Sequence, residues 1–142
     1  MLIKTAEVAN RIRDAIKRGL EQGARSVHNY AVRNVSGRVL HFGTGELARS
    51  IYTKVSKTRY GGSLRVGTKL YYGRLWERGF KHRGRSPKKF RSTKPGKFMA
   101  ARPWLRPAAE QALPEISNFI KAEIDRELKA YAGRVTIELK LN

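Results

Sequence analysis

A cation-rich stretch without acids, between Glu77 and Glu110, limits where this chain can build a core. Residues 77–104 read ERGFKHRGRSPKKFRSTKPGKFMAARPW and show no regular apolar period. Such a segment cannot bury enough apolar surface to fold by itself. The core must therefore come from the flanking sequence, and residues 78–101 are expected to form an extended basic loop.

The sequence before this segment begins with helical periodicity. Apolar residues recur at helical spacing from Val8 to Ala31, which predicts a long helix over about residues 5–33. Gly19 and Gly23 lie on or beside its apolar face, where glycine lowers helix stability. We expect either a bend at these glycines or a second backbone packed closely against them.

The sequence after the basic segment predicts another long helix. It is expected to begin near Pro107, because proline is tolerated at a first helical position. Pro114 should kink or restart it, and Gly133 should end it. Residues 134–141, RVTIELKL, alternate apolar and polar side chains, which predicts a final strand with one buried face.

Shorter elements are expected between residues 44 and 79. In GTGELARSI, Thr44 can cap a short helical turn. IYTKVSKT and SLRVGT predict a β-hairpin turning at the Gly-Gly of RYGGS, and YYGRLWERG predicts a short helix that stops at Gly79. The order predicts an α+β fold in a single domain over residues 1–142, with a small, mainly antiparallel sheet packed against two long helices.

The charge balance points to anionic partners. The chain has 31 Lys and Arg against 11 Asp and Glu, a formal charge of +20. Nucleic acid, an acidic protein surface and an anionic membrane are the partner classes for such a chain. The N-terminal sequence MLIKTAEVANRIRDAIKRGL interrupts its apolar residues with charges, so neither a signal peptide nor a membrane span is predicted.

No pattern in the sequence predicts catalysis or a cofactor. The absence of cysteine excludes disulfides and thiolate metal sites. His28, His41 and His82 are scattered and have no second ligand at a metal-binding spacing. Glu46 and Glu77 are isolated, whereas Glu123, Asp125 and Glu127 lie in the charge-patterned second helix and most simply support its solubility. We therefore expect no enzyme, metal, cofactor or small-molecule substrate; a nuclease would need a carboxylate pair that only folding could assemble.

The basic segment is the candidate binding element. Phe80, Phe90 and Phe98 interleave with its cations, and aromatic rings between cations can stack on bases or anchor a loop. The alternative is a solvated loop with these rings against the body. A loop of this length usually serves a purpose, so an ordering partner is expected. The candidate partner- or DNA-binding cations are Arg78, Lys81, Arg83, Arg85, Lys88, Lys89, Arg91, Lys94 and Lys97.

Four short motifs carry a family resemblance. TGELARSI, RVGT, YYGRLWERGF and ARPWLRPAAEQAL follow one another over about residues 44–118. In this order they resemble the tail-completion (neck) protein family of long-tailed bacteriophages. The chain departs from that pattern in Arg78 and Phe80 around Gly79 and in its basic insertion. The motif positions and loop anchors are Gly45, Leu47, Gly67, Thr68, Tyr72, Trp76, Glu77, Gly79, Phe80, Arg102, Pro103, Trp104 and Pro107.

The resemblance implies a non-enzymatic structural protein of the virion, made in the host cytoplasm. It implies a ring of identical copies around the DNA channel at the head–tail neck. Together with the charge, this predicts that the basic loop becomes ordered against an adjacent subunit, an adjacent neck or tail protein, or non-specifically against the DNA in the channel. Most motif residues should define the fold, and an ion pair between Glu77 and Arg102 is hypothesised to bracket the basic loop. Charge alone also fits a free nucleic-acid-binding protein of ribosomal or chromatin type, and the sequence leaves that alternative open.

Overall fold

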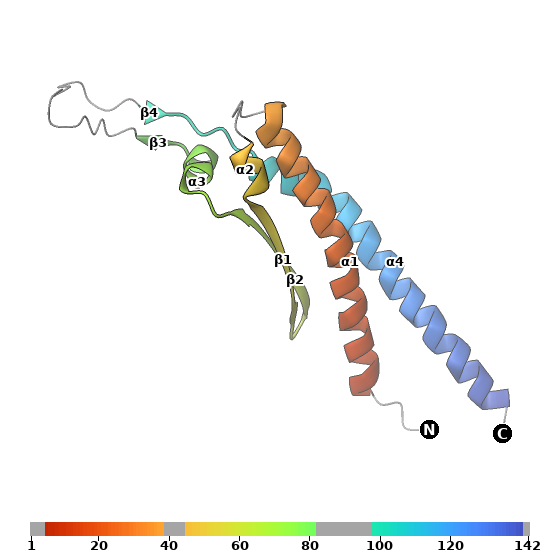
Figure 1. Ribbon diagram of the computed structural model, residues 1–142. Coiled ribbons are helices and arrows are strands. Elements are labelled where there is room, and N and C mark those ends of the chain that lie inside the picture. Colours follow the sequence, from red (N-terminus) through yellow and green to blue (C-terminus); the bar gives the residue numbers. More distant parts are fainter. Residues whose placement is uncertain (1–4, 39–44, 82–97, 141–142) are drawn as a thin grey trace, which may run out of the picture.

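Two long helices and a β-hairpin form the body of the molecule. The computed structural model describes residues 5–38, 45–81 and 98–140. Helix α1 lies between the hairpin on one side and α4 on the other (Figure 1). The fold is α+β, as predicted. The elements are α1 (Thr5–Arg33), the π-helical turn η1 (Asn34–Arg38), α2 (Glu46–Arg49), β1 (Ile51–Thr58), β2 (Gly61–Thr68), α3 (Tyr71–Arg78), β3 (Phe80–Lys81), β4 (Phe98–Met99) and α4 (Leu105–Lys140).

Helices α1 and α4 approach each other closely at two glycines of α1. A Cβ atom added to Gly19 would lie 2.6 Å from the Cα atom of Ile120, and one added to Gly23 would lie 2.5 Å from Cγ1 of Ile116. Real Cβ atoms do not approach other atoms so closely, so only glycine fits at these points. Of the two expectations for these glycines, the closely packed second backbone is confirmed.

The hairpin is confirmed, but its turn is not at the two glycines. Strands β1 and β2 are antiparallel, with Ile51 opposite Thr68 and Thr58 opposite Gly61. The residues between the strands are therefore Arg59 and Tyr60, and Gly61 and Gly62 begin β2. The glycines have a packing role, since a Cβ atom on Gly62 would lie 2.5 Å from Cδ1 of Leu20 in α1.

Helix α4 differs from the prediction at its start, its middle and its end. It begins at Leu105 and continues through Pro114 without restarting. Pro114 and Glu110, whose carbonyl loses its partner there, are both exposed, so water can satisfy that carbonyl. Gly133 does not end the helix, and the predicted strand is wrong because residues 134–140 are helical. A helix satisfies its backbone hydrogen bonds within the segment, whereas a strand needs a neighbouring strand to satisfy them.

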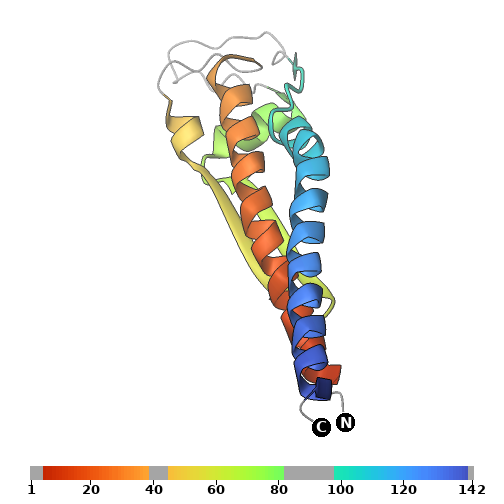
Figure 2. The same cartoon turned by 90° about the vertical axis from the view of Figure 1, so that its right-hand side faces the viewer.

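The core lies where α1, η1, α2, β1 and α4 meet. Trp104, which precedes α4, is 1% exposed and is the largest fully buried side chain among the described residues. The start of α1 and the end of α4 both lie at the opposite end of the molecule, where the two helices diverge (Figure 1 and Figure 2). The buried cluster consists of Ala31, Val35, Leu47, Ile51, Trp104 and Ala108.

Candidate functional site

The first two sequence motifs, TGELARSI and RVGT, are joined by hydrogen bonds at the base of the hairpin. The Ser50 hydroxyl donates to the Leu47 carbonyl over 2.8 Å and lies 2.6 Å from the Thr68 hydroxyl. Because the Ser50 proton is already used, Thr68 donates to Ser50, and its oxygen accepts from the Leu70 N–H at 3.1 Å. TGELARSI and RVGT, separate in sequence, thus form one hydrogen-bonded unit.

The third motif packs on this unit through α3. A Cβ atom on Gly73 would lie 2.6 Å from Leu47 Cδ1 and 2.8 Å from Thr68 Cγ2. The Gly73 carbonyl accepts a hydrogen bond from Trp104 Nε1 at 3.0 Å. We call this meeting point of the four motifs the motif junction; its members are Leu47, Ser50, Thr68, Gly73, Glu77 and Trp104. Of the other motif glycines, Gly45 precedes α2 with φ of 66°, and Gly67 lies against Tyr52.

Glu77 joins α3 to the start of α4. Its Oε2 accepts from the N–H groups of Trp104 at 2.8 Å and Leu105 at 2.9 Å, and its Oε1 accepts from the N–H of Arg106 at 2.9 Å. The first amides of a helix have no partner within it and favour negative charge. A carboxylate from a distant helix therefore caps α4, a role that sequence spacing gave no means to find.

The hypothesised ion pair between Glu77 and Arg102 is wrong. No ion pair joins them in the described part of the chain, because the Glu77 carboxylate is engaged with α4. The guanidinium of Arg102 lies over the ring of Trp76, 5.7 Å from its centroid. The Arg102 N–H also donates to the Trp76 carbonyl at 2.8 Å.

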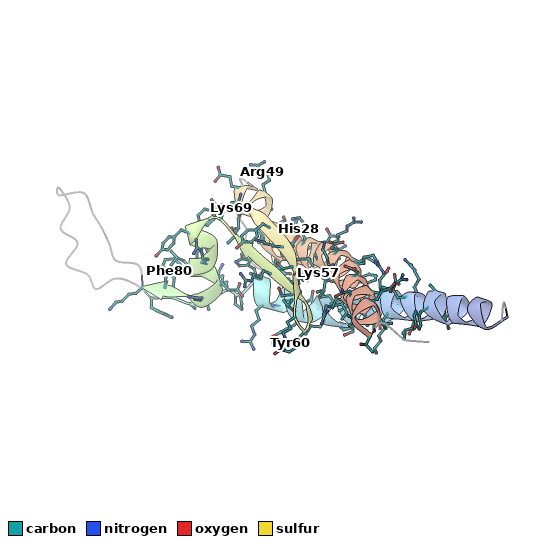
Figure 3. The ribbon with its side chains drawn as sticks, turned by 90° about the horizontal axis from the view of Figure 1, so that it is seen from below. His28, Arg49, Lys57, Tyr60, Lys69 and Phe80 are labelled. Carbon is teal, nitrogen blue, oxygen red and sulfur yellow. The ribbon has the colours of Figure 1, made fainter. Side chains whose placement is uncertain are left out.

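The two ends of the basic segment are held side by side. Gly79 ends α3 with φ of 75°, a value that favours glycine, and a Cβ atom there would lie 2.8 Å from the Ala101 nitrogen. Phe80 then pairs with Met99, and Lys81 with Phe98. The Phe80 ring meets Trp76 edge to face at 5.4 Å, and Figure 3 labels Phe80 on β3.

The structure places only some of the candidate cations. Arg78 and Lys81 are exposed at the root of the segment. Residues 82–97 lie outside the described residues, as do Thr44, His41 and His82. The predicted binding cations that fall there are Arg83, Arg85, Lys88, Lys89, Arg91, Lys94 and Lys97.

Among the other motif positions, Tyr72 is partly buried against the core cluster, whereas Arg102 and Pro103 are exposed. Pro107 is partly buried and lies within the first turn of α4, two residues after the helix begins. These positions thus surround the start of α4, in keeping with a role in the fold.

An ionic cluster joins the middle of α1 to α4. Arg18 contacts Glu123 at 2.9 Å and Glu127 at 2.6 Å, and Gln22 donates to Glu123 at 3.0 Å. The Glu123 side chain is 3% exposed, and its hydrogen bond from Arg18 lowers the pKa of that carboxyl. The interpretation of Glu123 as a solubilising surface charge is therefore wrong, because the sequence does not show which faces of the two helices meet.

Two hollows lie beside the motif junction. A cleft of about 580 Å³ opens between β2 and α3, and exposed Lys69, Arg74 and Arg78 are among its lining residues. A more apolar groove of about 470 Å³, lined in part by Leu64 and Leu113, runs between α1, β2 and α4. In residues 5–38, 45–81 and 98–140 no group of three potential metal ligands gathers. No described helix is apolar over a length sufficient to cross a bilayer.

Comparison with known proteins places the chain in a family. Residues 2–79, more than half of its 142 residues, match the family model described as "Bacteriophage HK97-gp10, putative tail-component". The chain belongs to this HK97-gp10-like family. The resemblance to a phage tail and neck family is thereby confirmed, and membership indicates a phage tail-related structural protein. No curated protein and no solved structure matches the chain.

The family match ends where the basic segment begins. It includes the first two motifs and all of the third except Phe80, and ARPWLRPAAEQAL lies beyond it. Trp104 and the start of α4 nevertheless contact Gly73 and Glu77 inside the matched region. The part of this HK97-gp10-like protein that matches the family thus depends on residues outside the match to complete its fold.

Proposed function

We propose that this HK97-gp10-like protein is a non-enzymatic structural component of the phage neck or tail end. Identical copies form a ring at the joint between head and tail, and residues 78–101 make the docking contact. The segment meets a neighbouring subunit, an adjacent neck or tail ring, or the DNA in the channel. The protein acts in the virion after synthesis in the host cytoplasm.

The observation that carries this proposal is the anchoring of the basic segment. Its first residues leave from Gly79 and its last residues return to Trp76, so both ends are held by α3. Glu77 in turn ties α3 to α4 and hence to the helix pair. Because both ends are attached to the body, a partner bound to the segment is held in a defined position relative to the helix pair. A joint between two parts of a particle requires such an attachment.

Charge supports a docking role for the same segment. With a formal charge of +20, copies of the chain repel each other unless anions lie between or beside them. A ring therefore needs acidic neighbours or DNA close to its cations. Assembly should weaken as salt rises, because contacts between exposed charges are screened.

Two replacements of residues 82–97 test the proposal in a phage that lacks the wild-type gene. In the first, Asn-Gly joins Lys81 directly to Phe98, because the paired strand ends suit a two-residue turn. In the second, length is kept and each Lys and Arg becomes Ser. We expect both proteins to fold, as judged by circular dichroism and thermal melting, and both to fail to yield heads joined to tails.

The outcomes separate length from charge. Normal joined particles from both variants would overturn the docking role of the segment. Joined particles from the second variant alone would assign the contact to length and not to charge. Mass spectrometry and imaging of purified wild-type particles test the location itself; a protein absent from them that co-purifies with nucleic acid would favour the free nucleic-acid-binding alternative.

A further inference from the structure

The outer face of the hairpin carries an unusual pair of cations. Lys54 in β1 lies directly opposite Arg65 in β2, so both side chains project from the same face. Like charges directly opposite each other destabilise a sheet. Both residues are exposed, and no ion pair relieves either of them in the described part of the chain.

This face points away from α1. The inner face of the hairpin carries Lys57, which forms an ion pair with Asp14 of α1, and Gly62, which lies against Leu20. Alternation along each strand places Lys54 and Arg65 on the opposite face. The cation pair is therefore open to a partner approaching from outside the body.

The positive surface continues from the hairpin into the cleft beside α3. Tyr52 lies on the same face as Lys54, 44% exposed, with its ring against Gly67. Tyr52 also lines the cleft together with Lys69, Arg74 and Arg78. Figure 3 labels Lys69 where β2 leads into α3. We call Lys54, Arg65, Lys69, Arg74 and Arg78, with Tyr52, the cationic strip.

Among the described residues, no acidic side chain neutralises the positive charge of the strip. Glu77 is the acid of the cleft, and its carboxylate accepts three backbone hydrogen bonds from the start of α4. The cations of the strip form no ion pair with any described residue. Their charge is available to an external anion.

The residue types around these cations distinguish between anionic partners. Protein interfaces have apolar, aromatic centres and few lysines. The outer hairpin face instead offers Lys54 and the facing pair of Ser56 and Ser63, and both Lys and Ser are depleted in protein interfaces. Phosphate oxygens accept hydrogen bonds from Lys, Arg, Ser, Thr and Tyr side chains. The composition fits a phosphodiester backbone better than an acidic protein surface.

We propose that the cationic strip binds the phosphate backbone of duplex DNA without reading its sequence. Small side chains at Ser56 and Ser63 let the backbone approach the hairpin closely, while the cations neutralise phosphates. This binding surface lies in the described body and is separate from residues 82–97. It depends neither on a ring nor on the location of the protein in a particle.

A paired-variant experiment on the full chain tests the strip. The variant Lys54→Thr/Arg65→Thr removes two charges from it, and Lys121→Gln/Lys129→Gln removes two exposed, unpaired charges from α4 as a matched control. Binding to a labelled DNA duplex is measured by fluorescence anisotropy over a range of salt concentrations. Thermal melting of each variant reports folding.

We expect the strip variant to bind DNA more weakly and with a smaller salt dependence. Two lost phosphate contacts lower the slope of log affinity against log salt by about 1.8. The ratio of the DNA affinity of the wild-type protein to that of the strip variant should then fall roughly tenfold between about 50 and 200 mM salt. Its melting temperature should be unchanged or raised, because the like-charge pair is gone. The control should keep the wild-type slope.

Three results would overturn the inference. The first is an unchanged slope in the strip variant, and the second is an equal decrease in both variants, which would mean that net charge alone governs binding. The third is loss of binding to poly-glutamate with DNA binding intact, which would assign the strip to an acidic protein. None of these affects the particle experiments above, so the two proposals fail separately.

Discussion

The helix pair and the motif junction are built by different means. Along α1 and α4, glycines allow the backbones to meet, and the ionic cluster around Glu123 joins the two surfaces. At the motif junction, directional hydrogen bonds fix how three elements meet: Glu77 and Thr68 accept them from backbone N–H groups, and Trp104 donates one to the Gly73 carbonyl. Close backbone packing and contacts between charged side chains join the two helices, whereas hydrogen bonds to backbone groups set the geometry from which the basic segment leaves.

The largest expected effect is at the centre of the junction. Trp104→Ala should lower the free energy of unfolding by about 3–5 kcal/mol, because it empties a fully buried site. Trp104→Phe keeps most of the volume and loses the hydrogen bond to Gly73, so it should cost less. Chemical denaturation measures both; equal losses would mean that packing is not the main contribution of Trp104.

Gly19→Ala tests the close approach of the helix pair. Helix propensity alone favours Ala by about 1 kcal/mol, but the added Cβ atom meets the backbone of Ile120. Overpacking of this kind should cost about 1–3 kcal/mol net. Gly133→Ala is the matched control, because nothing lies within 4 Å of its added Cβ atom, and it should stabilise the protein. Stabilisation by both substitutions in thermal melts would refute the close approach.

Glu123→Gln should destabilise the helix pair by about 1–2 kcal/mol near neutral pH, less than a fully buried pair would because Arg18 is partly exposed. The folded-state pKa of Glu123 is lowered, chiefly by the Arg18 hydrogen bond. Its stabilisation is therefore complete above the unfolded-state pKa of roughly 4.3 and is lost as pH falls through the lower folded-state pKa.

The difference between the wild-type protein and Glu123→Gln should thus disappear in acid, as measured by denaturation over a pH series. Asp125→Asn, at an exposed position on the same helix, should change stability by less than about 0.5 kcal/mol. A difference between wild type and Glu123→Gln that persists unchanged at low pH would show that the charge of Glu123 is not responsible.

The smallest expected effect is at the α4 cap. Glu77→Gln keeps an acceptor oxygen but removes the negative charge at the helix start, so it should cost about 1 kcal/mol. Glu110→Gln, on the exposed surface of α4, is its control. Hydrogen exchange at the amides of Trp104, Leu105 and Arg106 should accelerate in Glu77→Gln only, and unchanged exchange would contradict the capping role.

Periodicity predicted the elements well where a single helix or hairpin determines the pattern. Helix α1, strand β1 and helix α3 have the expected bounds, because apolar spacing and stop signals act locally. The Gly-Gly turn and the final strand were wrong for a shared reason. Both depend on contacts with another element. Gly62 is required because Leu20 of α1 packs against it, and alternation over residues 134–140 gives a strand only if a neighbouring strand exists.

Sequence motifs single out some residues of the motif junction but neither Ser50 nor Gly73, and they do not predict the contacts. Glu77, Arg102 and Trp104 were identified from motifs, yet the motifs do not show that Glu77 reaches backbone amides 27 or more positions away. The same holds for two other pairs. Arg18 meets Glu123 because α1 packs on α4, and Lys54 lies opposite Arg65 because of the register of the hairpin. Such contacts become visible only once register and helix orientation are known.

Because Lys81 pairs directly with Phe98, the fold of the body does not depend on the length or sequence of the segment between them. Closing a longer loop costs only slightly more free energy than closing a shorter one, about 0.6 kcal/mol for each doubling of length. An epitope or a small foreign domain grafted between these two residues should therefore leave the fold intact. The same position would serve as an attachment point for a label on the purified protein.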